Sequence, residues 1–256
     1  GKIGASFAYG PAYALDAHPE HAMAKMDYDD LQNHYWMDVY AYGRYPRSAM
    51  AYLESKGIAP VFEEGDQEIL LEAAKHVGFM GVNYYQTTTV SYNPIDGVGM
   101  ALTMNNSGKK GTTQESGEPG LYKKVANPFL KTTDWDWTID PMGLRMCCRI
   151  ITSRYDLPIV ISENGLGAFD KLEDGKIHDD YRIAYLKDHI EELKKACDDG
   201  CQVLSYCTWS FSDVLSWLNG YQKRYGFVYI DREETEGASM DRYKKDSFYW
   251  YKKVIE

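Results

Sequence analysis

Residues with reactive side chains stand at the ends of segments predicted to be short buried strands. In "IVISENGLG" (residues 159–167), an apolar, β-branched run stops at Glu163, beside a turn of asparagine and glycine. "GVNYYQT" places Asn83 and Tyr85 on one side of a second run, because side chains alternate along a strand. "YCTWSFSD" places Trp209 just after a third run. If these strands are parallel, the four side chains meet at one edge of the sheet.

A carboxylate, a tyrosine and a tryptophan around one cavity suit carbohydrate chemistry. Aromatic faces pack on the C–H surfaces of sugar rings, and amides and carboxylates bind sugar hydroxyl groups. Most glycosidases use two carboxyl groups, and in retaining enzymes one of them attacks the anomeric carbon. Glu163 is the candidate nucleophile, and a phenol such as Tyr85 would hold it in place and keep it ionised. A turn glutamate and a core tryptophan would be the structural alternatives, but four such side chains at the ends of neighbouring strands together favour a site.

Four strands and four helices are predicted to position these residues. The strands are Ile3–Phe7, Gly81–Tyr85, Ile159–Ser162 and Val203–Thr208, and the helices are Asp66–His76, Asp140–Arg154, Tyr181–Asp198 and the tail from Asp246. Alternating strands and helices predict a parallel α/β sheet, either doubly wound or a barrel. The loop Gly97–Gly120 follows a strand, so we expect it over the strands' C-terminal ends. A complete eight-stranded barrel needs about 250 residues, yet only four strand–helix units are apparent.

The composition argues against several classes of partner. The net charge of −10 is opposite to the basic face of nucleic-acid binders. No apolar run approaches the ~20 residues that cross a bilayer, so no membrane association is expected. Length and composition predict a single domain over residues 1–256. The five cysteines are expected to be reduced, buried side chains of a cytoplasmic protein. Neither they nor the histidines show metal-ligand spacing, so we expect no metal site.

Five motifs in this order resemble glycoside hydrolase family 1: "VISENG", "GVNYYQT", "TDWDWTIDPMGLR", "CTWSFSDVLSW" and "KRYGFVYID". The similarity extends from "GKIGASFAYGPAY" to "KKDSFYWYKKVI". The resemblance implies a (β/α)8 TIM barrel in which Glu163 is the nucleophile and Tyr85 donates a hydrogen bond to it. It also implies that Asn83 lines the sugar subsite and that Trp209 and Trp217 contact the sugar on the nucleophile's side of the bond.

The sequence departs from the family pattern in one important respect. The family's acid/base glutamate lies in an Asn-Glu-Pro motif after barrel strand four, and that motif is absent here. Glu118-Pro119 follows Gly117 in the long loop and is not a substitute. The resemblance therefore covers strands five to eight, with Ile3–Phe7 as strand five. The C-terminal half of a barrel agrees with the four units counted from periodicity.

The segment "LSWLNGYQKRYG" indicates a phosphate subsite. Family members that act on plain glucosides usually carry a glutamate where this chain has Ser216. A glutamate would repel a phosphate, whereas a serine donates to it. Lys223 and Tyr225 supply a point charge and a further donor, and the Ser, Lys, Tyr set is similar to the 6-phospho-β-glycosidase branch. The structural alternative is that Lys223 and Arg224 form a solvated turn.

These observations predict a retaining 6-phospho-β-glucosidase that hydrolyses phosphorylated β-glucosides of the cellobiose 6-phosphate type without a metal or organic cofactor. A 6-phospho-β-galactosidase is an alternative, because Trp217 is a feature of the galactosidase side, although the opening segment favours glucosidases. A third, weaker hypothesis is a plain β-glucosidase that tolerates serine at position 216. The remaining alternative is a catalytically inert phospho-sugar-binding half-barrel, which needs the missing half or associates with itself. Sugars phosphorylated on import by a phosphotransferase system imply a cytoplasmic location.

Overall fold

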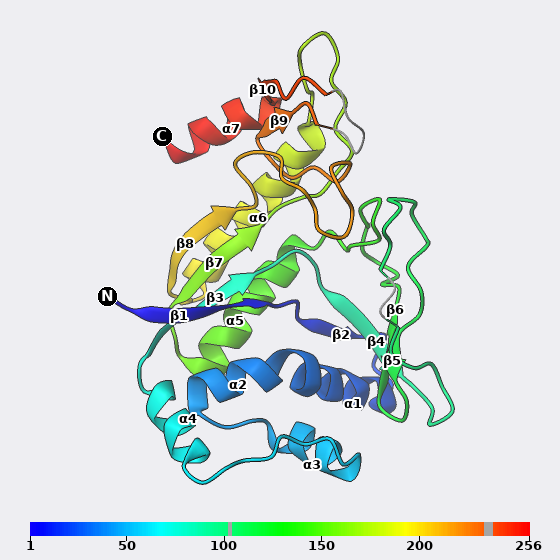
Figure 1. The fold of residues 1–256 in the computed structure, drawn as a ribbon, viewed down its shortest axis with the longest axis vertical. Helices are drawn as coiled ribbons and strands as arrows, with labels where there is room; N and C mark the ends of the chain where they lie inside the picture. Colours follow the sequence, from blue (N-terminus) through cyan, green and yellow to red (C-terminus); the bar gives the residue numbers. More distant parts are fainter. Residues whose placement is uncertain (102–103, 233–237) are drawn as a thin grey trace.

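A four-stranded parallel sheet forms the centre of the molecule (Figure 1). The computed structural model describes residues 1–101, 104–232 and 238–256. The strand order is β1 (Ile3–Ala8), β3 (Val77–Asn83), β7 (Ile159–Asn164) and β8 (Val203–Thr208), and each neighbouring pair is parallel. The four predicted strands are confirmed with one correction. The second begins at Val77 and ends at Asn83, so Tyr85 lies just beyond it.

Two long helices cover one face of this sheet. They are α5 (Pro141–Tyr155) and α6 (Asp180–Asp198), which pack on each other and on the strands. Strand residues that alternate toward the helices form the core with α5, and the fully buried members include Met80, Val82, Ile159, Ile161, Leu144 and Ile151. Asp140 caps α5 by accepting a hydrogen bond from the Gly143 amide at 2.9 Å. Both helices lie within one residue of their predicted ends.

The cysteines only partly follow the prediction. Cys147, Cys148 and Cys201 are buried in or beside the core, but Cys197 and Cys207 are exposed. The expectation of burial is therefore wrong for two of the five. Cys207 lies on β8, whose outer edge has no neighbouring strand among the residues that the structure describes. All five are free thiols.

The segment before β3 contains helices that the sequence pattern did not predict. They are α1 (Pro19–Tyr28), the π-helical turn η1 (Asp29–His34), α2 (Tyr35–Tyr42) and α3 (Arg47–Ser55). The π turn shifts the helical phase between α1 and α2, so the apolar residues follow no single period of 3.6. Helix α4 (Asp66–Ala74) was predicted, and it ends two residues before His76. Figure 1 shows α1 to α4 together below the sheet.

A second, smaller sheet adjoins the C-terminal ends of β1 and β3. Its order is β2 (Ala12–Ala14), β4 (Thr88–Tyr92), β6 (Tyr122–Val125) and β5 (Gly117–Glu118). The predicted loop Gly97–Gly120 contains β5, and its residues 102–103 lie outside the described residues. Part of this loop reaches the segments after the strand ends, as expected, because the Asn219 amide donates to the Asn105 carbonyl at 3.2 Å.

The chain ends with a short antiparallel pair and a helix at the opposite side of the molecule from α3 (Figure 1). The elements are β9 (Val228–Ile230), β10 (Arg242–Lys244) and α7 (Asp246–Ile255). Helix α7 confirms the predicted tail helix. In the parts of the chain that the structure describes, no helix combines the length and the apolar composition needed to cross a bilayer.

Candidate active site

Glu163 and Tyr85 lie together where two neighbouring strands end. Glu163 is near the end of β7, and its register partner on β3 is Asn83. The chain leaving β3 therefore passes beside Glu163, and the Tyr85 hydroxyl donates to Glu163 Oε2 at 2.6 Å. Burial, followed by the bond to this carboxylate and its charge, raises the pKa of Tyr85. The phenol keeps its proton and remains a donor to the carboxylate.

Asn83 lies on the opposite face of the sheet from the helices. Its Oδ1 accepts hydrogen bonds from Ser6 of β1 and Ser162 of β7, both at 2.8 Å. The two serine hydroxyls also contact each other at 2.7 Å. Because these bonds occupy the carbonyl oxygen, they orient the amide and leave its NH₂ group as the donor for a ligand. This hydroxyl-lined face is next to the Glu163 carboxylate, since Asn83 and Glu163 are paired in the sheet.

Trp209 lies next to the loop that follows Glu163 because of a close backbone contact. The Trp209 amide donates to the Asn164 carbonyl at 2.8 Å. A Cβ atom on Gly165 would lie 2.0 Å from the Trp209 carbonyl oxygen, so only glycine fits there. The glycine that follows Glu163-Asn164 is therefore needed for packing of the β7 loop against the β8 loop. The Trp209 side chain is 37% exposed, which leaves part of its ring open to a ligand.

Lys223 is buried among aromatic rings. Its Nζ lies 3.5 Å from the ring centroid of Trp137, 4.9 Å from that of Trp135 and 5.6 Å from that of Tyr225. Lys223 is only 1% exposed, and within the described residues no carboxylate forms an ion pair with it. Burial lowers the pKa of Lys223 to about 7. Arg224 is also buried, so the alternative of a solvated Lys-Arg turn is wrong.

Tyr225 lies between this lysine and Tyr85, the phenol that bonds Glu163. Its ring packs edge-on against Tyr85, with 6.2 Å between the centroids. Burial, and then the charge of Glu163, raises the pKa of Tyr225. Gly167 fits closely beside both residues, because a Cβ there would lie 2.5 Å from Lys223 Cε and 2.8 Å from Tyr225 Cζ. The second glycine of "ENGLG" thus makes room for the predicted phosphate ligands.

Ser216 and Trp217 are placed differently from the other predicted residues. They begin a turn in which the Ser216 amide donates to the Gly220 carbonyl at 3.0 Å. The Ser216 hydroxyl donates to Asn219 Oδ1 at 3.4 Å. Trp217 is 92% exposed and makes no ring contact with the described aromatic residues. The structure does not bring Trp217 to the cluster of Glu163 and Tyr85.

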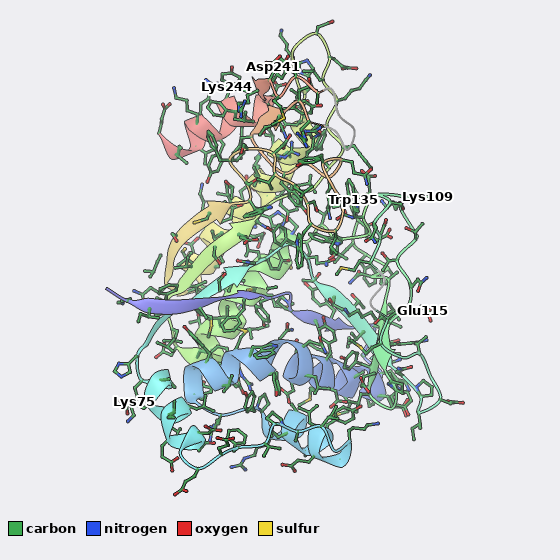
Figure 2. The ribbon with its side chains drawn as sticks, viewed as in Figure 1. Lys75, Lys109, Glu115, Trp135, Asp241 and Lys244 are labelled. Atoms are coloured by element: carbon green, nitrogen blue, oxygen red, sulfur yellow. The ribbon has the colours of Figure 1, made fainter. Side chains whose placement is uncertain are left out.

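Two tryptophans of the cluster were not among the predicted site residues. Trp137 packs edge-on against Tyr85 with 5.5 Å between centroids, so it contacts both Lys223 and the phenol that bonds Glu163. Trp135 is 1% exposed and packs on Phe169. Figure 2 shows Trp135 close to the loop that carries Lys109. The motif "TDWDWTIDPMGLR" contained both residues, but its spacing gave no reason to assign them to the site.

Glu118 is not part of this cluster. It lies in β5 of the second sheet and accepts a hydrogen bond from Tyr52 of α3. This placement agrees with the prediction that Glu118 does not replace the missing acid/base residue. Among the described residues, no group of three or more His, Cys, Asp or Glu side chains is arranged to hold a metal ion.

A carboxylate held by a phenol at the C-terminal end of a parallel strand, with indole rings around it, defines the class of barrel glycosidases. The whole chain, residues 1–256, matches the model of glycosyl hydrolase family 1, and the chain belongs to that family. The recognition made from the motifs is confirmed, and the similarity is to the family's phospho-β-glucosidase branch.

Curated relatives define this branch. The chain is 54% identical to the aryl-phospho-β-D-glucosidase BglC of Bacillus subtilis, covering 100% of this chain and 53% of that protein. It is 36% identical to the 6-phospho-β-glucosidase AscB of Escherichia coli, covering 99% of this chain and 50% of that protein. The chain therefore spans about half the length of the curated relatives that it matches.

Solved structures show the same coverage. A family 1 β-glucosidase from Thermotoga maritima superposes with a TM-score of 0.80 at 27% identity, covering 100% of this chain and 51% of that chain. A β-glucosidase from Exiguobacterium marinum gives a TM-score of 0.79 at 29% identity, covering 99% of this chain and 51% of that chain. The chain thus has the TIM-barrel fold of the family over about half of the barrel, as the count of four strand–helix units indicated.

Proposed function

We propose that this chain is the C-terminal half, strands five to eight, of a retaining 6-phospho-β-glucosidase, and that residues 1–256 form a single domain of that half-barrel. The observation that carries the proposal is Lys223, which is buried beside Tyr225 and has no ion-pair partner within the described residues. Because the chain has a net charge of −10, a local cation is needed to hold an anionic substrate. A phosphate dianion would supply a negative counter-charge for Lys223.

The proposed reaction uses Glu163 as the nucleophile. Its carboxylate attacks the anomeric carbon and forms a glycosyl ester while the bond to the leaving-group oxygen breaks. A second carboxyl group, about 5–5.5 Å from Glu163 in retaining enzymes, donates a proton to that oxygen. The same group then takes a proton from water, which attacks the anomeric carbon and releases Glu163. This chain lacks the Asn-Glu-Pro motif, so the second carboxyl group comes from the other half of the barrel.

The substrate is assigned as a 6-phospho-β-glucoside. Lys223 and Tyr225, with Ser216 on the neighbouring turn, would bind the phosphate. Asn83 and Trp209 would bind the sugar ring, and Trp217 would do so if its turn folds over a bound substrate. The curated relatives are named as phospho-β-glucosidases, which favours glucose over the galactose alternative. A substrate phosphorylated during import also fits a cytoplasmic enzyme.

A second candidate follows from the missing acid/base residue. The chain alone would bind a phosphorylated sugar without hydrolysing it, as an inert half that requires the rest of the barrel. The absence of Asn-Glu-Pro from the sequence favours this behaviour for the isolated chain.

The test uses a chimera that joins this chain to the part of the Bacillus subtilis BglC protein that it does not match. Hydrolysis of 4-nitrophenyl 6-phospho-β-glucoside is compared with that of the unphosphorylated compound. Lys223→Ala is expected to raise KM at least about tenfold for the phosphorylated compound only, since a charge-assisted bond is lost. The control Lys195→Ala removes an exposed lysine paired with Glu192 and should change neither substrate.

Glu163→Gln separates chemistry from binding in the same chimera. It is expected to lower kcat by at least about 10³-fold on both substrates while binding of the phosphorylated substrate is retained. Retained turnover would reject Glu163 as the nucleophile. Equal losses on both substrates in Lys223→Ala would remove the phosphate role and leave a plain β-glucosidase.

A further inference from the structure

Six charged side chains form a buried network behind the loops of the candidate site. Carboxylates and cations alternate in the order of contact Asp179, Arg182, Asp170, Lys245, Asp213 and Arg224. The most exposed of these side chains is 7% accessible. With three anions and three cations, the network is neutral as a whole.

One end of the network holds the loop that follows the nucleophile. Arg182 of α6 donates to Asp179 at 2.5 Å and to Asp170 at 3.1 Å. Asp170 also accepts a hydrogen bond from Lys245, which lies just before α7. Although burial raises it, the cations of Arg182 and Lys245 hold the pKa of Asp170 below its usual value. Asp170 is seven positions after Glu163, so this loop is fixed to both helices.

The other end holds the loops that follow β8. Lys245 donates to Asp213 Oδ1 at 2.7 Å, and Arg224 donates to Asp213 Oδ2 at 3.1 Å. Asp213 also accepts from the Gly226 amide at 2.9 Å. The Arg224 guanidinium donates further to the carbonyls of Ile230 and Arg232, both at 2.7 Å. Asp213 thus joins the segment before Ser216 to the segment after Tyr225.

Arg224 links the network to the backbone that carries Lys223 and Tyr225, the proposed phosphate ligands. Its backbone pairs with Ala168, with N···O distances of 2.9 and 3.0 Å, and Arg182 donates to its carbonyl at 3.0 Å. Successive side chains of an extended segment point to opposite sides. Because Arg224 points into the network, Lys223 and Tyr225 on either side of it point away from the network, toward Trp137 and Tyr85.

Burying six charged groups carries a large desolvation free energy, so stability alone does not explain their use to connect these loops. The desolvation of buried ions often offsets their mutual attraction. Apolar residues of the same volume would stabilise the fold at least equally well. What charged hydrogen bonds supply is direction and fixed length. Lys223 has no ion-pair partner of its own within the described residues, so its position depends on the backbone that Arg224 fixes.

We propose that this network is a positioning device for substrate selection. Without touching the substrate, Asp213 and its partners set the place of Lys223 and Tyr225 relative to Glu163, and so determine the preference for 6-phosphorylated over plain glycosides. The inference rests on the proposed function and adds the residues that control its specificity.

The test is Asp213→Asn in the chimera described above. The amide keeps the size of the side chain and an acceptor for Gly226, but it loses the charge that holds Arg224 and Lys245. The kcat/KM for the phosphorylated substrate is expected to fall by about 10- to 100-fold, mainly through KM. The unphosphorylated substrate should change by less than about threefold. If Asp213→Asn does not fold, Arg224→Lys takes its place. This variant keeps the positive charge but loses the bonds to the carbonyls, so the kcat/KM for the phosphorylated substrate should fall by a smaller factor.

The matched control is Asp38→Asn. Asp38 is also a buried carboxylate, and Arg154 donates to it twice, at 2.8 and 2.6 Å. This variant should lower the melting temperature without changing the ratio of the two substrates. If Asp213→Asn behaves like this control, the network is only structural and the inference is overturned. If Lys223→Ala leaves the ratio unchanged, the proposed function fails and the inference falls with it.

Discussion

At the scale of a single residue, Lys223 is expected to lower the stability of the free protein while serving as a proposed ligand for the substrate. The fold buries its ammonium group among three aromatic rings, and these contacts replace only part of the lost hydration. Placing a cation in such a site destabilises the free protein, and an anionic ligand removes that penalty. Residues that bind ligands are often retained at a cost in stability of this kind.

Replacing Lys223 should therefore stabilise the chain in a pH-dependent manner. Burial lowers its pKa from 10.5 to about 7. The penalty is complete below pH 7, shrinks between pH 7 and 10.5, and is absent above. Lys223→Met is expected to raise the free energy of unfolding by about 1–3 kcal/mol near pH ~6 and by less near pH ~9. Denaturant unfolding at both pH values measures this, with Lys195→Met as the surface control. A gain that does not depend on pH would contradict the explanation.

At the scale of elements, the predictability of each part follows from how local its determinants are. Strand β7 was predictable from the sequence because Ile159 to Ile161 is an apolar, β-branched run. Glu163 was predictable as a candidate site residue because it stands at the end of that run. The helices from α1 to α2 were not visible because the π turn between them breaks the period. The charge network was not predictable at all, since Asp170 and Lys245 are 75 residues apart and nothing local pairs them.

The loop that follows β7 makes a testable connection between an element and the site. Gly167→Ala would place a methyl group 2.5 Å from Lys223 Cε and 2.8 Å from Tyr225 Cζ, so both of the proposed phosphate ligands must shift. The kcat/KM of the chimera for the phosphorylated substrate should fall at least about tenfold, with a loss of about 1–3 kcal/mol in stability. Gly99→Ala is the control, because a Cβ there meets nothing within 4 Å. Full phosphate preference in Gly167→Ala would show that the close packing is irrelevant to recognition.

At the scale of the whole molecule, the sheet has two outer edges. Within the described residues, strands β1 and β8 have a neighbour on one side only, whereas β3 and β7 are flanked on both sides. Exposed side chains accompany these edges, with Ile3 69% and Leu204 49% accessible. Unpaired, apolar strand edges favour association with another chain. The other half of the barrel would cover both edges.

We therefore expect the isolated chain to associate with itself. Size-exclusion chromatography with light scattering, over a range of concentrations, should show species larger than 29.3 kDa. Adding the unmatched part of the Bacillus subtilis relative should convert them to a defined complex that hydrolyses the phosphorylated substrate. A stable monomer that is active by itself would contradict both this expectation and the need for a second half.

The alternation around Arg224 has a consequence for the exchange of specificity between enzymes. The proposed phosphate ligands lie within a short stretch after β8, so residues 210–226 look like a segment that could be transplanted into a plain glycosidase. Four of the six charges of the network, those of Asp170, Asp179, Arg182 and Lys245, lie outside it. A graft without them would bring Lys223 and Tyr225 but not their orientation. Inheritance of the new specificity thus requires distant positions to change together, in evolution as in the laboratory.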